Sequence, residues 1–286
     1  MDEFSPYERG HRRSVAKRKV ALYLGLAILL AAATLVAVNA SGSSVRSLSA
    51  RSAGEAGNTV PQSNGCAVTF TNPGPPALTA CVSGHGNVNE LIYSPFSVPV
   101  DHIASEGYCL RDLGTGTAYF DATNSEAGWG AATQSSTATT TSVTRTTTDG
   151  IYTLTQNIFF KYGSRLVLVG NLVTNNDTVS HAVRFNRYGD FDIDASSGSD
   201  VFDVAGASVF AQQDNGAVLT SLGNPALVQT LGAELFNSWN FSGKLTCSHT
   251  LTAGPTNSAD YVAVMQHTAT IPGGGTVNFR IGYRLL

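Results

Sequence analysis

The sequence predicts an all-β protein, in which a single large antiparallel β-sandwich follows an N-terminal membrane-targeting helix. Apolar and polar residues alternate along most segments after residue 66, which is the period of a strand with one buried face. Threonine and valine, which favour pleated surfaces, dominate these segments. One uncharged apolar run, at residues 20–38, has the length of a helix that enters or crosses a membrane.

Composition and charge exclude two broad classes of protein. The chain has 286 residues, of which 42% are hydrophobic and 13% are charged, and its net charge is −3. So few charges are atypical of an intrinsically disordered chain. An acidic protein does not bind nucleic acid through a basic surface. The length suits one large folded domain.

The N-terminal segment predicts export. Residues 1–19 form a basic region with six Lys or Arg and three Asp or Glu, and the apolar run 20–38 follows. This is the pattern of a signal peptide, or of a single transmembrane helix whose basic end stays in the cytoplasm. Cleavage near Ala40 would secrete the protein, whereas an uncleaved run would anchor it with its C-terminal domain outside. Residues 39–65 are rich in Ser and Gly and are expected to be a flexible linker.

The predicted sandwich domain, residues 66–286, begins with several clear strand patterns. Residues 150–162 and 164–176 are expected to form a long hairpin, and the second is apolar on both faces, like a central strand. Residues 181–194 follow after a turn. Residues 261–271 and 276–286 flank a Pro-Gly-Gly-Gly sequence and are expected to form a further hairpin.

Two less regular segments complete the prediction. The Thr/Ser-rich tract at 133–148 is expected to be an exposed edge strand or a loop. Residues 229–236 are the one short segment after the targeting run that suits a helix. The sequence has no βαβ alternation and no repeat of fixed period, so we expect one domain rather than an array.

The four cysteines all follow the apolar run, which fits an oxidising destination. They are Cys66, Cys81, Cys109 and Cys247. Their spacing lacks the close pairs of a zinc site, so disulfides are the expected state. Three pairings are open, and the sequence does not choose among them. In one of them Cys66–Cys81 closes a short loop and Cys109–Cys247 is a long-range link.

The densest polar feature is an acidic ladder at residues 187–203. Asp190, Asp192 and Asp194 alternate with apolar residues, so on a strand all three carboxylates share one face. Asp200 and Asp203 follow a Ser/Gly turn. Like charges at such spacing repel unless solvent, a cation or Arg/Lys partners neutralise them. Calcium, which prefers six to eight oxygen ligands, is the metal that this set would suit.

Other interpretations of this segment stay open. The spacing begins like an EF-hand loop, but Ala195 stands where that loop needs glycine, and Val201 stands where it needs glutamate. A solvated acidic edge with Arg184 and Arg187 as local partners is the structural alternative. A catalytic carboxylate in this strand is the third.

The remaining chemistry-bearing residues form no recognisable pattern. Glycosidases need two carboxyl groups on either side of one bond, and no spacing selects a pair. Besides the aspartates of the acidic ladder, the candidate catalytic carboxylates are Glu90, Glu106, Asp112, Asp121, Glu126 and Glu234. The aromatic residues that would stack on sugars or fill the core are Trp129, Trp239, Tyr93, Tyr108 and Tyr188. The histidines of the predicted sandwich domain are scattered singly and lack metal-site spacing: His85, His102, His181, His249 and His267. Nothing demands an organic cofactor.

Several segments together resemble a family of exported bacterial β-sandwich proteins that has no assigned role. They are HIASEGYCLRD (102–112), TAYFD (117–121), TRTTTDGIYTLTQ (144–156), RYGDFDID (187–194) and DVFDVAGASVFAQ (200–212). The layout of a long hairpin and an acidic strand is also similar to the mutarotase-like sandwich domains that accompany glycoside hydrolases. The resemblance implies a carbohydrate-associated sandwich, and it carries no catalytic residues over.

Three functions are therefore considered. The first is an exported, non-enzymatic module that binds a glycan or a cell-surface component, with calcium supporting the 187–203 segment. The second is a carbohydrate-active hydrolase, lyase or epimerase that uses carboxylates of that segment. The third is a structural surface or adhesion subunit whose edge strands pair with neighbours. We expect no nucleic-acid partner, and membrane contact only through residues 20–38 if they are retained.

Overall fold

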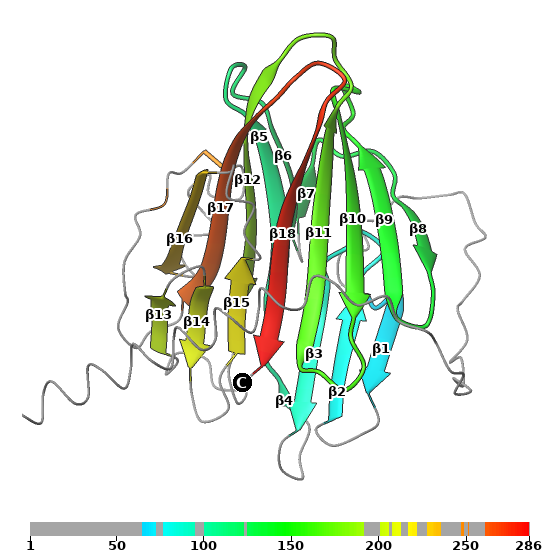
Figure 1. The fold of residues 1–286 in the computed structure, drawn as a ribbon, viewed down its shortest axis with the longest axis vertical. Coiled ribbons are helices and arrows are strands. Elements are labelled where there is room, and N and C mark those ends of the chain that lie inside the picture. The colour runs from blue at the N-terminus through cyan, green and yellow to red at the C-terminus, as the bar shows by residue number, and fades with distance from the viewer. Residues whose placement is uncertain are drawn as a thin grey trace, which may run out of the picture. The chain divides into compact units, whose positions relative to one another are not determined.

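A computed structural model describes most of the predicted sandwich domain (Figure 1). The described ranges are 65–72, 77–94, 100–122, 125–191, 201–205, 208–212, 217–221, 228–235, 247–248, 251 and 261–285. The chain divides into two compact units, residues 1–47 and 48–286, and all described residues belong to the second unit. The predicted targeting run 20–38, Ala40 and most of the predicted linker 39–65 lie outside the described residues.

The described residues form strands and no helix, which confirms the predicted all-β class. All strand pairs are antiparallel, and the strands make three sheets. The eight-stranded sheet contains, in spatial order, β13 (Val201–Ala205), β14 (Ser208–Gln212), β15 (Ala217–Ser221), β18 (Thr276–Leu285), β11 (Leu166–Asn175), β10 (Tyr152–Phe160), β9 (Thr140–Thr146) and β8 (Thr133–Ser136).

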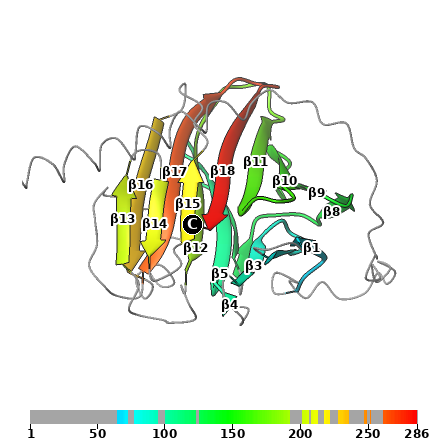
Figure 2. The same ribbon diagram turned by 60° about the horizontal axis from the view of Figure 1, so that its bottom comes forward.

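The two other sheets are smaller. The six-stranded sheet runs β16 (Val228–Leu235), β17 (Tyr261–Ile271), β12 (His181–Asp190), β5 (Ser105–Asp112), β6 (Ala118–Ala122) and β7 (Ser125–Ala127). The four-stranded sheet runs β1 (Val68–Asn72), β2 (Ala77–Val82), β3 (Val88–Ser94) and β4 (Val100–Asp101). In Figure 2 its cyan strands lie near β5.

The core lies where the inner faces of these sheets meet. Alternate residues of β10 and β11 are fully buried, as the two-residue period of a strand requires. Phe185 of β12 stacks on Phe279 of β18 with ring centroids 5.0 Å apart, which joins the six-stranded and eight-stranded sheets. Phe70 of β1 stacks on Phe160 of β10 at 5.7 Å, which joins the four-stranded sheet to the eight-stranded one.

A buried polar cluster also spans the three sheets. Arg187 of β12 is completely buried and pairs with Glu106 of β5, with 2.6 Å between Nε and Oε1. Its guanidinium donates to Tyr283 Oη of β18 at 2.8 Å and to Gln156 Oε1 of β10 at 2.7 Å. It also donates to the carbonyl of Gly86, in the turn between β2 and β3, at 2.9 Å. One side chain therefore contacts all three sheets.

Several strand predictions are confirmed. Residues 150–162 and 164–176 contain β10 and β11, which pair in register from Tyr152↔Asn175 to Phe160↔Val167. The Thr/Ser tract forms β8, which lies at an edge of its sheet, and β9. The segment 181–194 begins with β12.

Two local predictions are wrong. Residues 261–271 and 276–285 do form β17 and β18, but these strands do not make a hairpin. β17 pairs with β12 and β16, whereas β18 pairs with β11 and β15, so the turn between them crosses from one sheet to the other. Residues 228–235 form strand β16 rather than a helix, because pairing with β17 over eight registered positions outweighs a weak helix preference.

The structure pairs Cys66 with Cys81 and Cys109 with Cys247. The first bond joins the start of the described domain to β2. The second links β5 to a position 138 residues later in the chain, so it closes a long loop and constrains the unfolded chain. Two disulfides fit an exported protein. Among the described residues no helix is long and apolar enough to span a membrane.

His267 of β17 generates a prediction about acid stability. Its side chain is 2% exposed and packs against Phe279, and neither ring nitrogen has a hydrogen-bond partner. Burial lowers its pKa from 6.5 to about 4. Between pH 6.5 and pH 4 the unfolded chain therefore binds a proton at His267 that the folded chain does not bind. The neutral imidazole contributes fully to the stability of the fold above pH 6.5. This contribution is lost as the pH falls toward 4.

We expect His267→Phe to remove this dependence. The wild-type free energy of unfolding should fall by roughly 3 kcal/mol more than that of the variant between pH 7 and pH 4. Urea unfolding at several pH values measures the difference. If the free energy of unfolding depends on pH equally in the two proteins, the pKa of His267 does not differ between the folded and unfolded chains.

Candidate functional site

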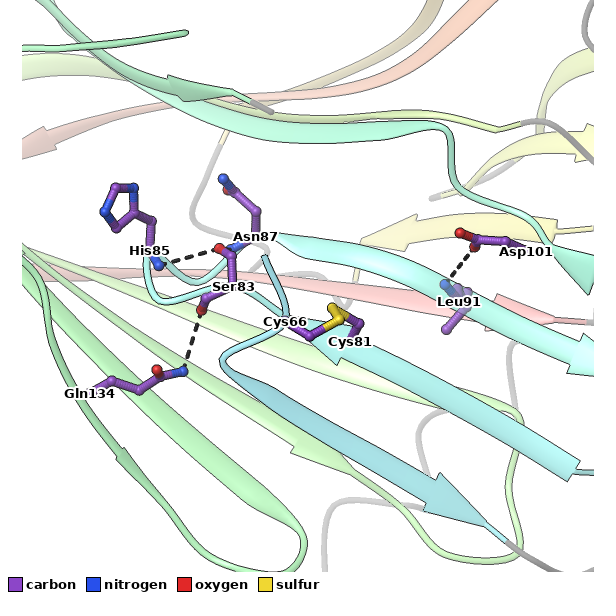
Figure 3. The surroundings of a disulfide bond; sticks show 8 residues. All are labelled: Cys66, Cys81, Ser83, His85, Asn87, Leu91, Asp101 and Gln134. Atoms are coloured by element: carbon purple, nitrogen blue, oxygen red, sulfur yellow. Dashed lines mark hydrogen bonds between the residues drawn. A yellow bond between two sulfur atoms is a disulfide. The ribbon is translucent and has the colours of Figure 1, made fainter. Parts of the chain in front are cut away.

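The turn between β2 and β3, residues 83–87, places a histidine between the sheets. Ser83 Oγ accepts hydrogen bonds from the backbone N–H groups of His85 and Asn87, at 3.2 and 3.0 Å. Gly86 has φ of +87°, and a Cβ there would lie 2.3 Å from Nε2 of Gln156, so glycine is needed. Figure 3 shows this turn beside the Cys66–Cys81 disulfide, with Gln134 of β8 donating to the Ser83 carbonyl.

His85 meets two carboxylates and an arginine, which we call the His85 cluster: His85, Asp121, Glu126 and Arg145. Asp121 and Glu126 are directly opposite each other on β6 and β7. Arg145 comes from β9 of the eight-stranded sheet, where the alternation of buried and half-buried residues points it inward. The four side chains therefore come from all three sheets.

Short polar contacts hold the cluster together. His85 Nδ1 lies 2.8 Å from Asp121 Oδ2 and 3.3 Å from Glu126 Oε2. Arg145 donates from Nη1 to Asp121 and from Nη2 to Glu126 Oε2, the latter at 2.8 Å. Asn87 Nδ2 donates to the other oxygen of Asp121 at 2.5 Å. Both carboxylates are thus paired with the same guanidinium.

Burial differs within the cluster. The side chains of Asp121 and Arg145 are 0% and 2% exposed, whereas those of His85 and Glu126 are 15% and 22% exposed. The cluster is therefore exposed to solvent at His85 and Glu126. On the inner side, Arg145 Nη1 lies 3.5 Å from Tyr108 Oη, and its Cζ lies 5.9 Å from the centroid of the Trp129 ring.

The electrostatics favour a charged Asp121. Burial alone would raise its pKa, but the hydrogen bond from His85 and the charges of His85 and Arg145 outweigh burial, so its pKa lies below the usual value. Burial likewise opposes the charged form of Arg145, and contacts with Tyr108, Asp121 and Glu126 more than compensate, which raises its pKa. Burial raises the pKa of Tyr108, whose hydroxyl donates to the His85 carbonyl.

The His85 cluster contains the donor set of a metal site, but it is poorly suited to one. Donor atoms of His85, Asp121 and Glu126 lie within 4.8 Å of one another. However, the Arg145 guanidinium already bonds both carboxylates. A divalent cation would have to displace this charge or sit beside it. The arrangement is better suited to hydrogen bonding with a polar ligand at the His85–Glu126 side.

Most of the predicted acidic ladder falls outside the described residues. Asp192, Asp194 and Asp200 lie there, and the side chain of Asp203 in β13 is also not described. Asp190 ends β12 and is 5% exposed. Calcium at this segment therefore stays a prediction.

The alternative that made Arg187 a local partner of the ladder is wrong. Arg187 is three residues before Asp190 on β12, so it points to the opposite face of the strand and into the interior, where it pairs with Glu106. Arg184 donates to the carbonyl of Cys247 at 3.1 Å.

Other predicted residues occupy a second polar cluster. The carboxylate of Asp112 accepts hydrogen bonds from Tyr152 Oη at 2.7 Å and from two backbone N–H groups, and it lies 2.6 Å from Nδ1 of His181. Nε2 of His181 lies 3.1 Å from Asp177. This cluster links the turns at one end of the strands, so we assign it to structure.

The remaining predicted residues have mixed outcomes. Trp129, Tyr93, Tyr108 and Tyr188 are buried, none more than 7% exposed, and His102 is fully buried. Trp239 and His249 lie outside the described residues, and the side chain of Glu234 is not described. The sequence patterns did not identify Arg145 and Asn87 as residues of a candidate site. The signal for Arg145 was a lone charge at an inward position of the alternating 140–146 pattern.

The comparisons with known proteins bear on the fold. No family model matches the sequence, and no curated protein matches it. Among solved structures, a bacterial glucoamylase complexed with acarbose matches 88% of this chain and 34% of its own, with 12% identity and a TM-score of 0.57. The chain thus spans about a third of that protein and shares the fold of that part.

Two further solved structures are similar at lower scores. A galactose mutarotase-like protein from Lactobacillus casei matches 77% of this chain and 100% of its own, with 11% identity and a TM-score of 0.44. A heparan sulfate lyase from Pedobacter heparinus matches 76% of this chain and 34% of its own, with 11% identity and a TM-score of 0.41.

The pairing of Arg145 with buried Asp121 generates a prediction. Arg145→Met should lower the free energy of unfolding by roughly 3–5 kcal/mol, because it leaves a buried carboxylate without its cation. Urea unfolding at pH 7 measures the loss. The double variant Arg145→Met/Asp121→Asn should recover part of it, because the fully buried position 121 then carries no charge, whereas Glu126, which also loses its cation, is partly exposed to solvent. A loss below about 1 kcal/mol in the single variant would contradict this description of the cluster.

Proposed function

We propose that the protein is an exported β-sandwich module that binds a glycan or another cell-surface component without turning it over. The observation that carries the proposal is the hydrogen bonding of the carboxylates in the His85 cluster. Both of its carboxylates are bonded to Arg145, which disfavours proton transfer by either of them. The same groups, partly exposed at His85 and Glu126, offer fixed polar atoms to a ligand.

The carbohydrate part of the proposal is supported by the fold. A third of a bacterial glucoamylase has the same fold as this chain. Fold alone does not define a ligand, but it makes sugars the first ligands to test. We further propose that residues 20–38 direct export and are either cleaved near Ala40 or kept as an anchor, and that residues 39–65 connect them to the sandwich at 66–286.

The test is a binding screen with the purified full chain on a panel of immobilised glycans, with calcium and with a chelator. We expect binding to at least one glycan and no reaction product. Glu126→Gln should weaken that binding about tenfold, because a charge-assisted hydrogen bond contributes about that much. Glu90→Gln, a matched change on the four-stranded sheet, should leave binding unchanged.

Three outcomes would contradict the proposal or parts of it. If no glycan binds, the proposed ligand class is wrong. If Glu90→Gln and Glu126→Gln behave alike, the His85 cluster does not contact the ligand. If the chelator changes neither binding nor melting temperature, calcium at Asp190, Asp192 and Asp194 with Asp200 and Asp203 is wrong.

An enzymatic function is the second candidate, because His85 and Glu126 form a solvent-accessible pair of an imidazole and a carboxylate 3.3 Å apart. Such a pair has the geometry of an acid–base couple. If the screen yields a reaction product, and if Glu126→Gln abolishes its formation while Glu90→Gln does not, the protein is an enzyme and not a binding module.

A further inference from the structure

The outer face of five neighbouring strands carries an ordered array of hydroxyl groups. These strands are β8, β9, β10, β11 and β18 (Figure 1), and we call their outward surface the hydroxyl face. Thr144 and Thr155 are direct cross-strand partners with hydroxyl oxygens 3.1 Å apart. Thr146 and Thr153 form a second such pair at 3.2 Å. These side chains are half-buried or exposed, because the alternate residues of each strand face the core.

The hydroxyl face is stiff before any ligand binds. Threonine is branched at Cβ and has few rotamers, so little conformational entropy is lost when its hydroxyl is used. Each hydroxyl has one donor and two acceptor sites, and a single Thr–Thr bond leaves capacity for another partner.

An exposed aromatic ring lies on the same face. Phe159 of β10 is 46% exposed. Its cross-strand neighbours are Thr140 of β9 and Leu168 of β11, which is half-buried. An apolar ring flanked by a leucine and a hydroxyl is a surface on which the apolar side of a sugar ring can pack.

The charge of the hydroxyl face differs from that of the domain around it. Residues 41–286 carry 11 basic and 17 acidic side chains. The five strands contain no Asp or Glu. Arg280 and Arg284 point outward from β18, opposite Gly170 and Leu166 of β11. Among the described turn residues, Asp149 and Asp177 are at the other end of these strands, where Tyr152 pairs with Asn175 and Thr174 pairs with Thr276.

We propose that the hydroxyl face binds an extended acidic polysaccharide, a chain of sugar rings that carry carboxylates. Arg280 and Arg284 would pair with the carboxylates, since guanidinium groups match them in geometry and charge. Phe159 would pack against a sugar ring, and the threonine hydroxyls would bond ring hydroxyls. The proposal goes beyond glycan binding at the His85 cluster, because it names a ligand chemistry and a separate surface.

The test uses polygalacturonate as the acidic chain and its fully methyl-esterified form as a neutral chain with the same backbone. Calorimetry with the full-length protein should detect binding of the acidic chain only, and binding should weaken as salt is added. The double variant Arg280→Glu/Arg284→Glu should weaken binding at least about tenfold. Arg111→Glu, the same type of substitution at a single site on the outer face of the six-stranded sheet, should have no effect. Phe159→Ala, which keeps all charges, should also weaken binding.

The outcomes separate this inference from the proposed function. Equal binding of the acidic and esterified chains, or wild-type binding by the double variant with an unchanged melting temperature, would overturn it. If another glycan binds and only Glu126→Gln weakens it, the proposed function stands and the hydroxyl face is not the site. If sedimentation shows a dimer that the double variant abolishes, the face is an interface between copies of the chain, and the proposal is overturned.

Discussion

The arrangement of the three sheets depends on one buried cation, Arg187. A guanidinium without solvent costs several kcal/mol unless each donor finds a partner. The fold supplies them from every side: Glu106 within its own sheet, Gln156, Asn171 and Tyr283 on the eight-stranded sheet, and the Gly86 carbonyl at the end of the four-stranded sheet. Any displacement of one sheet against another would therefore leave a buried donor unpaired.

This constraint also positions the His85 cluster. The turn that carries His85 is held on one side by Arg187, through the Gly86 carbonyl. On the other side Gln156 Nε2 and Tyr108 Oη donate to the His85 carbonyl at 2.8 and 3.1 Å. The imidazole therefore reaches Asp121 and Glu126 from a fixed backbone. A polar ligand at this opening would meet preorganised groups, which lowers the entropic cost of binding.

The sequence predicted what depends on local pattern and missed what depends on pairing between distant strands. The strand patterns at 150–162 and 164–176, the second apolar on both faces, identified β10, β11 and their hairpin. The hairpin predicted for β17 and β18 was wrong, because a short glycine-rich turn can connect two strands of one sheet or two strands of different sheets. Here β17 pairs with β12 and β18 pairs with β11, so the turn connects two sheets. Arg187 was interpreted as a partner of nearby aspartates, whereas its partner Glu106 is 81 residues away in the chain.

The most direct test of this account is the stability of the full chain with Arg187→Met, measured by urea unfolding at pH 7 beside Arg187→Met/Glu106→Gln. Because the single variant leaves the buried Glu106 carboxylate uncompensated, the account predicts a loss of roughly 3–5 kcal/mol and a partial recovery in the double variant. A single variant within about 1 kcal/mol of the wild type would show that the sheets do not depend on Arg187.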